Sequence, residues 1–548
     1  MQKKSRQALK NIVQNNASLN SVSRYFIPVA RVIASERADR PEILPDCRTL
    51  RAFTVHGFPV CIIARGGYIV VDFGRELSGG VRIVTSNMKP CRVRLRFGES
   101  LAEACGNPDM THAIHDIELP LTFFSATDFG NTGFRFVRLD VLEGELHLIN
   151  LMAVSEVRDL RQFGTFHSSD ARLDSIFETA VRTVRLNIQD FILDGIKRDR
   201  LLWGGDIHPE TAVILRIFGA IPEIEKTLEQ LCFHTEPERF VNGHIENPLW
   251  LLWTIHDLWF YSGDHGVPER FSSFIRTNAE RYLGMIREDG AVDFPGRLFL
   301  DWPSSSDPAA VLAGIHGLLA IALNRTKTMY GELGLDATPL EAALTKLARN
   351  VPSPGLNKGA AALQHLAGLA ECRTVLEKDP FSGIGTFLGH YILQASSNNR
   401  AALDLVRRYW GGMLDMGATT FWEDFDLAWL KDNPTRIDEM PVPGRKNIHA
   451  DYGDYCYKGL RHSLCHGWAS GPAAWCSRKI LGIEPLKPGF DALRFDPDLC
   501  GLDFAEGTIP TPHGTVQVRL EAGKEPEIIA PGNIVIIREN NTEHFRKI

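Results

Sequence analysis

Hydrophobic and polar residues alternate along the first third of the chain, as they do in strands with one buried face. The alternation is clear over residues 81–84 and 92–97 and largely holds over 134–141, while 68–73 is mostly apolar. Glycine pairs stand between these segments, where antiparallel strands need turns. The pattern predicts a β-sandwich over residues 45–164.

The periodicity changes near Ser168, after which apolar residues recur at spacings of mostly three and four, on one face of a helix: Leu173, Ile176, Phe177, Ala180, Val184 and Ile188. Ser169 and Asp170 precede this stripe and are suitable N-caps. Similar amphipathic segments repeat to about residue 480, which predicts one all-α domain over residues 165–484. Paired helices closed into a ring would bury these faces, but the pattern does not distinguish a ring from a solenoid.

Strand patterns return at the end of the chain, with alternation over residues 515–520 and an apolar run over 533–538. They predict a small β-domain over residues 485–548. Residues 1–44 form an N-terminal extension of polar, helical character. The expected fold is therefore multidomain and mainly α, with a β-domain on each side of the helical domain.

Composition narrows the class of protein. The hydrophobic content of 44% and charged content of 23% are typical of a globular protein, and the net charge of -7 argues against a nucleic-acid partner. The basic N-terminus lacks an apolar signal region, and no run of apolar residues is long enough to span a membrane, so we expect a cytoplasmic location. The ten cysteines are scattered without C-x-x-C pairs, which indicates neither a zinc site nor disulfides. The N-terminal extension suggests an arm that docks on a partner subunit, and a homodimer is one such assembly.

Residues 194–206 (DGIKRDRLLWGGD) are the most informative part of the sequence. Carboxylates packed beside Lys197, Arg198 and Arg200 are suited to a site that keeps some acids ionised and leaves one able to give up a proton. The face of Trp203 is suited to cover the apolar face of a sugar ring. A solvated loop of ion pairs is the alternative, but the glycines among the charges favour a site, because they allow close backbone approach.

This stretch resembles the catalytic motif D-x-x-x-R-[E/D]-R-x-x-W-x-G-D of the bacterial α-L-rhamnosidases of glycoside hydrolase family 78. Residues 417–423 resemble the second catalytic segment of that family, and residues 463–472 resemble the helix start that follows it. Further similar segments occur in the same order, at residues 71–77, 97–103, 488–490 and 509–514. The resemblance implies an (α/α)6-barrel catalytic domain flanked by β-domains, and an inverting hydrolase that releases terminal, non-reducing α-L-rhamnose from small glycosides or oligosaccharides.

An inverting glycosidase needs a general acid and a general base about 6.5–9.5 Å apart, on opposite faces of the sugar. The resemblance places Asp199 as the acid and Glu423 as the base, with Asp424 as the local competitor for the second role. Many family members have Glu where this chain has Asp199. Because Arg198 and Arg200 should favour the ionised form of Asp199, we expect their guanidiniums to point at Asp194, Asp206 or other anions.

The resemblance also implies a set of substrate-binding residues: Asp194, Arg198, Trp203, Asp206, Asp301, Trp302 and His466. Carboxylates accept strongly from adjacent sugar hydroxyls, which is suited to Asp194 and Asp206. For Asp206 the alternative is a helix N-cap, for Trp302 a packed loop residue, and for His466 a buried structural histidine. Trp250 belongs to a helical pattern that is more typical of core. No metal or cofactor is implied.

Two other functions remain open at this point. One is a different (α/α)6-barrel hydrolase, such as one acting on unsaturated uronic acids, in which Arg198, Arg297 and Lys446 would bind the substrate carboxylate. The other is a carbohydrate-binding protein without turnover, although acids at both positions 199 and 423 speak against it. The sequence does not indicate the aglycone or the linkage.

Overall fold

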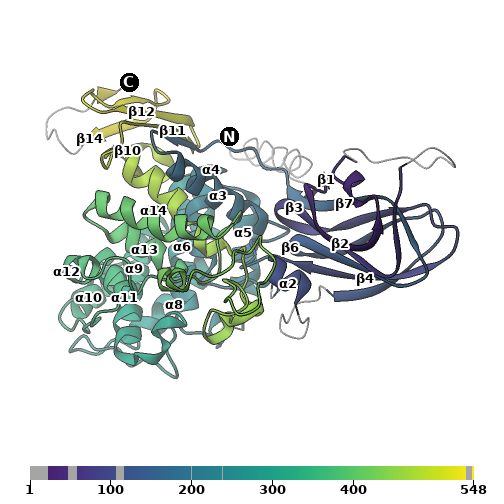
Figure 1. Cartoon of the computed structure of the whole chain (residues 1–548). Helices are drawn as coiled ribbons and strands as arrows, with labels where there is room; N and C mark the ends of the chain where they lie inside the picture. The colour runs from purple at the N-terminus through teal and green to yellow at the C-terminus, as the bar shows by residue number, and fades with distance from the viewer. Residues whose placement is uncertain are drawn as a thin grey trace, which may run out of the picture.

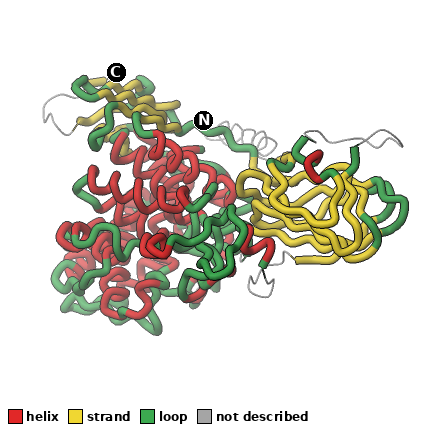
Figure 2. Tube along the Cα trace, in the orientation of Figure 1, coloured by secondary structure: helices red, strands yellow, loops and turns green. Residues whose placement is uncertain are grey.

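The computed structural model of the chain describes residues 22–46, 59–106, 116–198, 200–236, 238–538 and 546–547. A strand-rich region, a helical region and a second, smaller strand-rich region follow one another along the chain, with the helices in the middle (Figure 1). Figure 2 shows the larger group of strands to the right of the helical body and the smaller group above it. The predicted order of β, α and β regions is present.

The N-terminal region is a seven-stranded sheet in the order β1-β7-β3-β6-β4-β5, with β2 paired to β3. The long strand β3 pairs with β6 in two stretches separated by an irregularity between Asp72 and Leu77, and both ends of β3 pair with β7. The predicted sandwich is therefore one sheet that curls around its own apolar core. The strands are β1 (Val22–Pro28), β2 (Arg31–Asp39), β3 (Cys61–Thr85), β4 (Cys91–Gly98), β5 (Asp116–Leu121), β6 (Ala126–Glu143) and β7 (Leu146–Arg158).

The predicted boundary at residue 44 is wrong for the described part of the N-terminal extension. Strand β1 pairs with β7 from Val22 to Pro28, and β2 pairs with β3, so residues 22–39 belong to the sheet and are not helical. Alternation in these two strands is weak because their side chains are mostly exposed or half-buried. Residues 1–21 lie outside the described part of the chain, and the predicted docking arm stays a prediction there.

The helical region begins where the sequence predicts. Helix α3 (Ala171–Asn187) is capped by Asp170, whose side chain accepts from the backbone N–H groups of Arg172 and Leu173, and its predicted apolar stripe is buried. The other α-helices of this region follow in order: α4 (Ile207–Ile217), α5 (Pro222–Phe233), α6 (Asn247–Ser262), α7 (Gly266–Arg270), α8 (Ser272–Leu283), α9 (Pro308–Glu332), α10 (Thr338–Leu347), α11 (Lys358–Leu366), α12 (Arg373–Glu377), α13 (Thr386–Ala395), α14 (Asn399–Asp415) and α15 (Gly471–Trp475).

The helices share one apolar core. Helix α9 packs against α6 and α11, α11 packs against α13, and α3 packs against α14 and α15. By length and composition α9 resembles a membrane span, but 78% of its apolar window is buried inside the structure, as in the central helix of a packed domain. The same core continues into the C-terminal strands through residues such as Leu493, Ile509 and Val516.

The C-terminal region contains two four-stranded sheets, β15-β14-β10-β9 and β13-β12-β11-β8. Strand β8 precedes the first core helix α3, so the chain touches this region before it enters the helices. The predicted boundary at 165 therefore assigns β8 to the helical domain, although β8 pairs with β11, and the predicted boundary at 485 cuts through β9. The strands are β8 (Thr165–Ser168), β9 (Ile483–Pro485), β10 (Ala492–Phe495), β11 (Phe504–Thr511), β12 (Gly514–Glu521), β13 (Glu527–Ile529), β14 (Val535–Arg538) and β15 (Arg546–Lys547).

Candidate active site

A cavity of about 490 Å³ in the helical region brings together residues that are far apart in the sequence. Its lining includes every site residue predicted from the sequence that the structure describes: Asp194, Arg198, Trp203, Asp206, Asp301, Trp302, Glu423 and His466. Asp199, the predicted general acid, lies outside the described residues. A cavity of this size, with apolar walls and converging polar groups, is typical of a small-molecule site.

Asp194 connects the start of the charged motif to Leu201 through hydrogen bonds. One oxygen of its buried carboxylate, Oδ1, accepts from the backbone N–H groups of Gly195 and Leu201 at 2.7 and 3.0 Å. The backbone N–H of Asp194 donates to the carbonyl of Leu201 at 3.1 Å. At the far end Gly204 lies so close to Asn247 that a Cβ would be 2.8 Å from the Asn247 Cβ. At Gly204 the backbone therefore approaches a neighbouring residue closely, as predicted for the glycines of this loop.

Arg198 and Glu423 form the central ion pair of the cavity. The Arg198 Nη2 donates to both carboxylate oxygens of Glu423, at 2.7 and 2.6 Å, and both side chains are buried. Arg200, two residues further on, instead donates to the backbone and side-chain oxygens of Asn131 at 2.8 Å. The guanidinium of Arg198 therefore has an anionic partner, and that partner is the predicted base.

Glu423 is also held through its backbone. Its N–H donates to the carbonyl of Ser463 at 2.9 Å, and its carbonyl accepts from Thr386 Oγ1 and Trp468 Nε1 at 2.5 and 3.1 Å. The Ser463 N–H donates to its Oε2 at 3.0 Å. Burial raises the pKa of Glu423, whereas Arg198 and the Ser463 N–H act to lower it by stabilising the charged form.

Asp424, the competitor for the same role, is placed differently. Its Oδ1 accepts from the next backbone N–H, that of Phe425, at 2.9 Å, and its side chain is not part of the cavity lining. Burial raises the pKa of this carboxyl to about 7. The position facing the cavity therefore belongs to Glu423.

Asp206 and His466 line the cavity close to Glu423. Asp206 stands at the N-cap position of α4, but its side chain makes no capping hydrogen bond, so capping does not account for it. His466 Nε2 is 3.8 Å from both Asp206 Oδ1 and Glu423 Oε1, which is longer than a hydrogen bond. Burial lowers the pKa of His466 well below its ordinary value, and the ring packs against Trp468. A neutral imidazole is therefore within reach of two carboxylates.

The opposite wall contains Asp301 and a row of aromatic rings. Asp301 is buried, accepts from the Ser304 N–H at 2.8 Å, and has a pKa raised by burial. Ring centroids follow one another at 5 to 6 Å along Trp203, His244, Phe299, Trp302 and Tyr455. Trp302 is 36% exposed, which places it at the mouth of the cavity.

Sequence reasoning missed several lining residues. Trp250 is buried, as the helical pattern predicts, yet it also lines the cavity. Trp468 lies inside the recognised segment 463–472, and its stack on Phe387, with ring centroids 5.0 Å apart, forms part of the apolar wall. The local sequence around these rings resembles ordinary core, so no local signal marks them.

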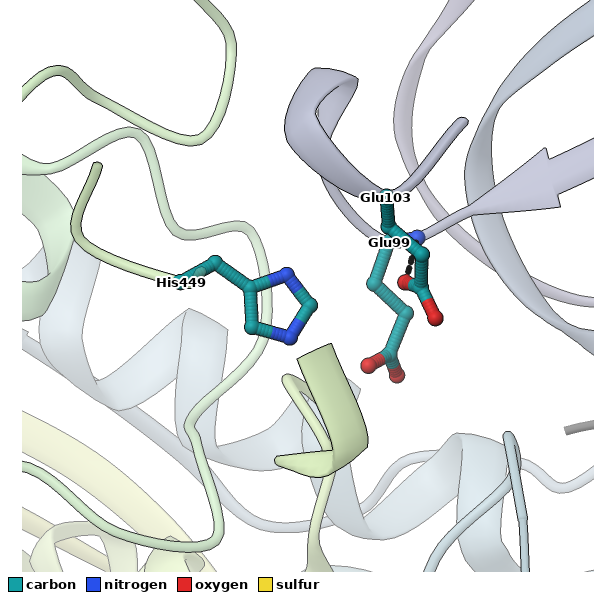
Figure 3. A group of neighbouring side chains, drawn as sticks. All are labelled: Glu99, Glu103 and His449. Atoms are coloured by element: carbon teal, nitrogen blue, oxygen red, sulfur yellow. Dashed lines mark hydrogen bonds between the residues drawn. The ribbon is translucent and has the colours of Figure 1, made fainter. Parts of the chain in front are cut away.

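Of the three residues considered for a uronate substrate, Arg198 and Arg297 line the cavity and Lys446 does not. Arg297 lines the cavity, but Arg198 is bonded to Glu423, and Lys446 pairs with Asp432 at 2.7 Å outside the lining. One group with metal-type donors occurs among the described residues, namely Glu99, Glu103 and His449 (Figure 3), and it lies outside the cavity.

Two family models match parts of the helical region and of the C-terminal sheets. Residues 161–245 match the bacterial alpha-L-rhamnosidase 6 hairpin glycosidase domain, and residues 482–526 match the bacterial alpha-L-rhamnosidase C-terminal domain. An alpha-L-rhamnosidase of Alteromonas sp. (strain LOR) is 23% identical over 535 residues, which covers 85% of this chain and 55% of the relative. The chain thus spans about half the length of this curated relative.

Solved structures show the same fold. The family 78 rhamnosidase of Bacillus sp. GL1 matches with a TM-score of 0.71 and 20% identity, over 86% of this chain and 53% of the other. A rhamnosidase from Klebsiella oxytoca, solved with rhamnose bound, matches with a TM-score of 0.66 and 20% identity, over 84% of this chain and 97% of the other.

Two regions of the chain, one in the helical region and one in the C-terminal sheets, thus resemble domains of bacterial alpha-L-rhamnosidases.

Proposed function

We propose that this protein is an exo-acting, inverting α-L-rhamnosidase that releases terminal α-L-rhamnose from small glycosides or oligosaccharides, with its helices arranged as an (α/α)6 barrel. The observation that carries this proposal is the convergence of eight sequence-predicted residues, from four separate segments of the chain, on one cavity. Such convergence is expected of a binding site and not of scattered structural residues.

In this proposal Glu423 is the general base that activates water. A carboxylate has about four acceptor positions, and the bonds from Arg198 and Ser463 leave room on Oε1, the oxygen facing His466. Arg198 stabilises the ionised form of this carboxylate and so opposes the burial that raises its pKa, as a base requires. Asp199 is the general acid that protonates the leaving oxygen from the opposite face of the sugar.

The other groups of the cavity are suited to a deoxy sugar. Asp206 and Asp301 supply acceptors for adjacent hydroxyls, and the neutral His466 can donate to one. The stacked rings of Trp468 and Phe387 offer an apolar surface for the methyl group at C5. Trp302 at the mouth is placed to cover the remaining face of the ring.

The test is hydrolysis of 4-nitrophenyl α-L-rhamnopyranoside by the wild type, Asp199→Asn, Glu423→Gln and the neighbouring control Asp424→Asn. We expect release by the wild type, a loss of kcat of about 10³-fold in each of the first two variants, and near-wild-type turnover in the control. Proton NMR of the first product should show the β-anomer, as inversion requires. An inactive wild type would contradict the proposed function, and an active Glu423→Gln would contradict the assignment of the base.

A further inference from the structure

The N-terminal sheet region contributes two buried carboxylates to the junction with the helical region. Glu99 follows strand β4, and Glu103 belongs to the short helix α2 (Leu101–Cys105), both fully buried. Figure 3 shows their carboxylates beside His449, which belongs to the helical region. The Glu99 N–H donates to a Glu103 oxygen at 2.8 Å, which holds the two side chains in one orientation.

Lys197 neutralises this cluster. Its Nζ lies 3.1 Å from Glu99 Oε2 and 3.2 Å from Glu103 Oε1, and its side chain is 1% exposed. Although burial acts to lower the pKa of Lys197, the carboxylates of Glu103 and Glu99 raise it, so the amine is charged. The ammonium group therefore supplies the positive charge that a metal ion would supply between these carboxylates.

The cluster is bonded to the segment that holds the predicted base. Lys197 Nζ donates to the carbonyls of Leu460 and His462 at 3.0 and 2.6 Å. Glu99 Oε2 accepts from the N–H of Leu464 at 2.6 Å. Between these two anchors lies Ser463, whose N–H donates to the carboxylate of Glu423.

The same cluster is bonded to the motif loop, because Lys197 directly precedes Arg198 and Asp199 in the sequence. Arg198 then bonds both to Glu423 and, through Nε, to the carbonyl of Arg461 at 2.7 Å. His449 adds a second link, since its ring bonds to Ser100 at 2.7 Å and to the His462 carbonyl at 2.9 Å.

We propose that the N-terminal sheet domain is a working part of the active site, in which Glu99 and Glu103 act through Lys197 as positioning residues for the loop of Arg198 and Asp199 and for the segment that holds Glu423. This inference rests on the proposed function. Stability alone is a weak reason for such a cluster, because replacing buried charges by neutral groups of similar volume is often neutral or stabilising. Fixed geometry is a stronger reason, since displacing a catalytic group by about 1 Å can cost about 10²-fold in rate.

The experiment compares Glu99→Gln, the triple variant Glu99→Gln/Glu103→Gln/Lys197→Met and the control Asp116→Asn, all in the full chain. Asp116 is an acid of the same sheet, and its ion pair with Arg94 stays within the sheet. Kinetics with 4-nitrophenyl α-L-rhamnopyranoside give kcat and KM, and thermal unfolding gives Tm. We expect kcat to fall about 10²-fold in Glu99→Gln with KM little changed, and no change in the control.

The triple variant separates positioning from stability, because it leaves no unpaired charge in the cluster. We expect its Tm to be near that of the wild type, while kcat remains about 10²-fold low because the bonds to residues 460–464 are lost. A triple variant that regains both Tm and kcat would overturn the proposal, as would a folded Glu99→Gln with wild-type kcat. An inactive wild type would instead reject the proposed function.

Discussion

The two walls of the cavity are built differently. On one wall Arg198, Glu423 and His466 are each less than 10% exposed; charged and backbone hydrogen bonds hold Arg198 and Glu423, and the His466 ring packs against Trp468. On the other, Trp302 is 36% exposed and stacks on Tyr455, which is 48% exposed and lies just outside the cavity lining. One wall is rigid and polar, and the other is apolar and open to solvent.

This difference separates two tasks. Transferring a proton and activating water require donors and acceptors whose positions and charges are set before the substrate arrives. Covering a sugar face or an aglycone requires apolar area, which tolerates small displacements. We therefore expect substitutions on the polar wall to lower kcat, and substitutions on the aromatic wall to raise KM.

The largest effect is expected for Arg198→Met. The substitution leaves Glu423 buried without its cation, so its pKa rises further above the ordinary value. A base works above its pKa, and the acidic limb of the kcat/KM profile should therefore move to higher pH, with kcat about 10²-fold lower at neutral pH. The measurement is a pH–rate profile with the 4-nitrophenyl substrate.

Arg200→Met is the matched control for this profile. It removes a guanidinium two residues away that bonds to Asn131 and not to Glu423. Its acidic limb should coincide with that of the wild type. A shift of equal size in both variants would mean that general loss of positive charge, and not the bond to Glu423, sets the profile.

Trp302→Ala tests the aromatic wall. Removing the indole face should raise KM about fivefold, or about 1 kcal/mol, while kcat changes less. Phe233→Ala is the control, because Phe233 is an exposed ring of the same helical region outside the cavity lining. A Trp302 variant that loses kcat at constant KM would remove the proposed division between the two walls.

Glu210, a buried residue of α4 outside the cavity lining, should carry a cost in stability. Both carboxylate oxygens lack a hydrogen-bond partner within the described structure, and the side chain lies so close to Gly467 that a Cβ there would be 2.2 Å from its Cδ. Burial, with Asp206 and Asp194, raises its pKa well above 4.5. The unfolded chain therefore loses this proton at a lower pH than the folded protein, and stability declines as pH rises above about 4.5.

Glu210→Gln removes that decline because the amide does not ionise. The variant and the wild type should unfold at similar temperatures near pH 4.5, and the variant should have a Tm about 2 °C higher at pH 8. Differential scanning calorimetry at both pH values measures this difference. Equal Tm values at pH 8 would show that the carboxyl is accommodated at no cost.

The sequence predicted the polar wall better than the aromatic one. Charged residues such as Arg198 and Glu423 stand in short segments whose types and spacing are unusual, so they are visible without a structure. Trp250 and Trp468 have the local pattern of core residues, and their exposure to the cavity depends on how distant helices pack. The role of Glu99 was also hidden, because its partners Lys197 and Leu464 come from segments that meet through tertiary contacts alone.

The smallest effect is expected at Tyr455, the ring that extends the aromatic row beyond the cavity lining. Tyr455 stacks on Trp302 but does not line the cavity, so we expect it to contact the aglycone and not the terminal sugar. Tyr455→Ala should raise KM for the 4-nitrophenyl glycoside about twofold and leave the affinity for free rhamnose unchanged. Tyr452→Ala is the control, since Tyr452 makes a similar stack with Trp429 away from the cavity lining. Calorimetric titration with rhamnose decides the point, because an equal loss of rhamnose affinity would place Tyr455 against the terminal sugar.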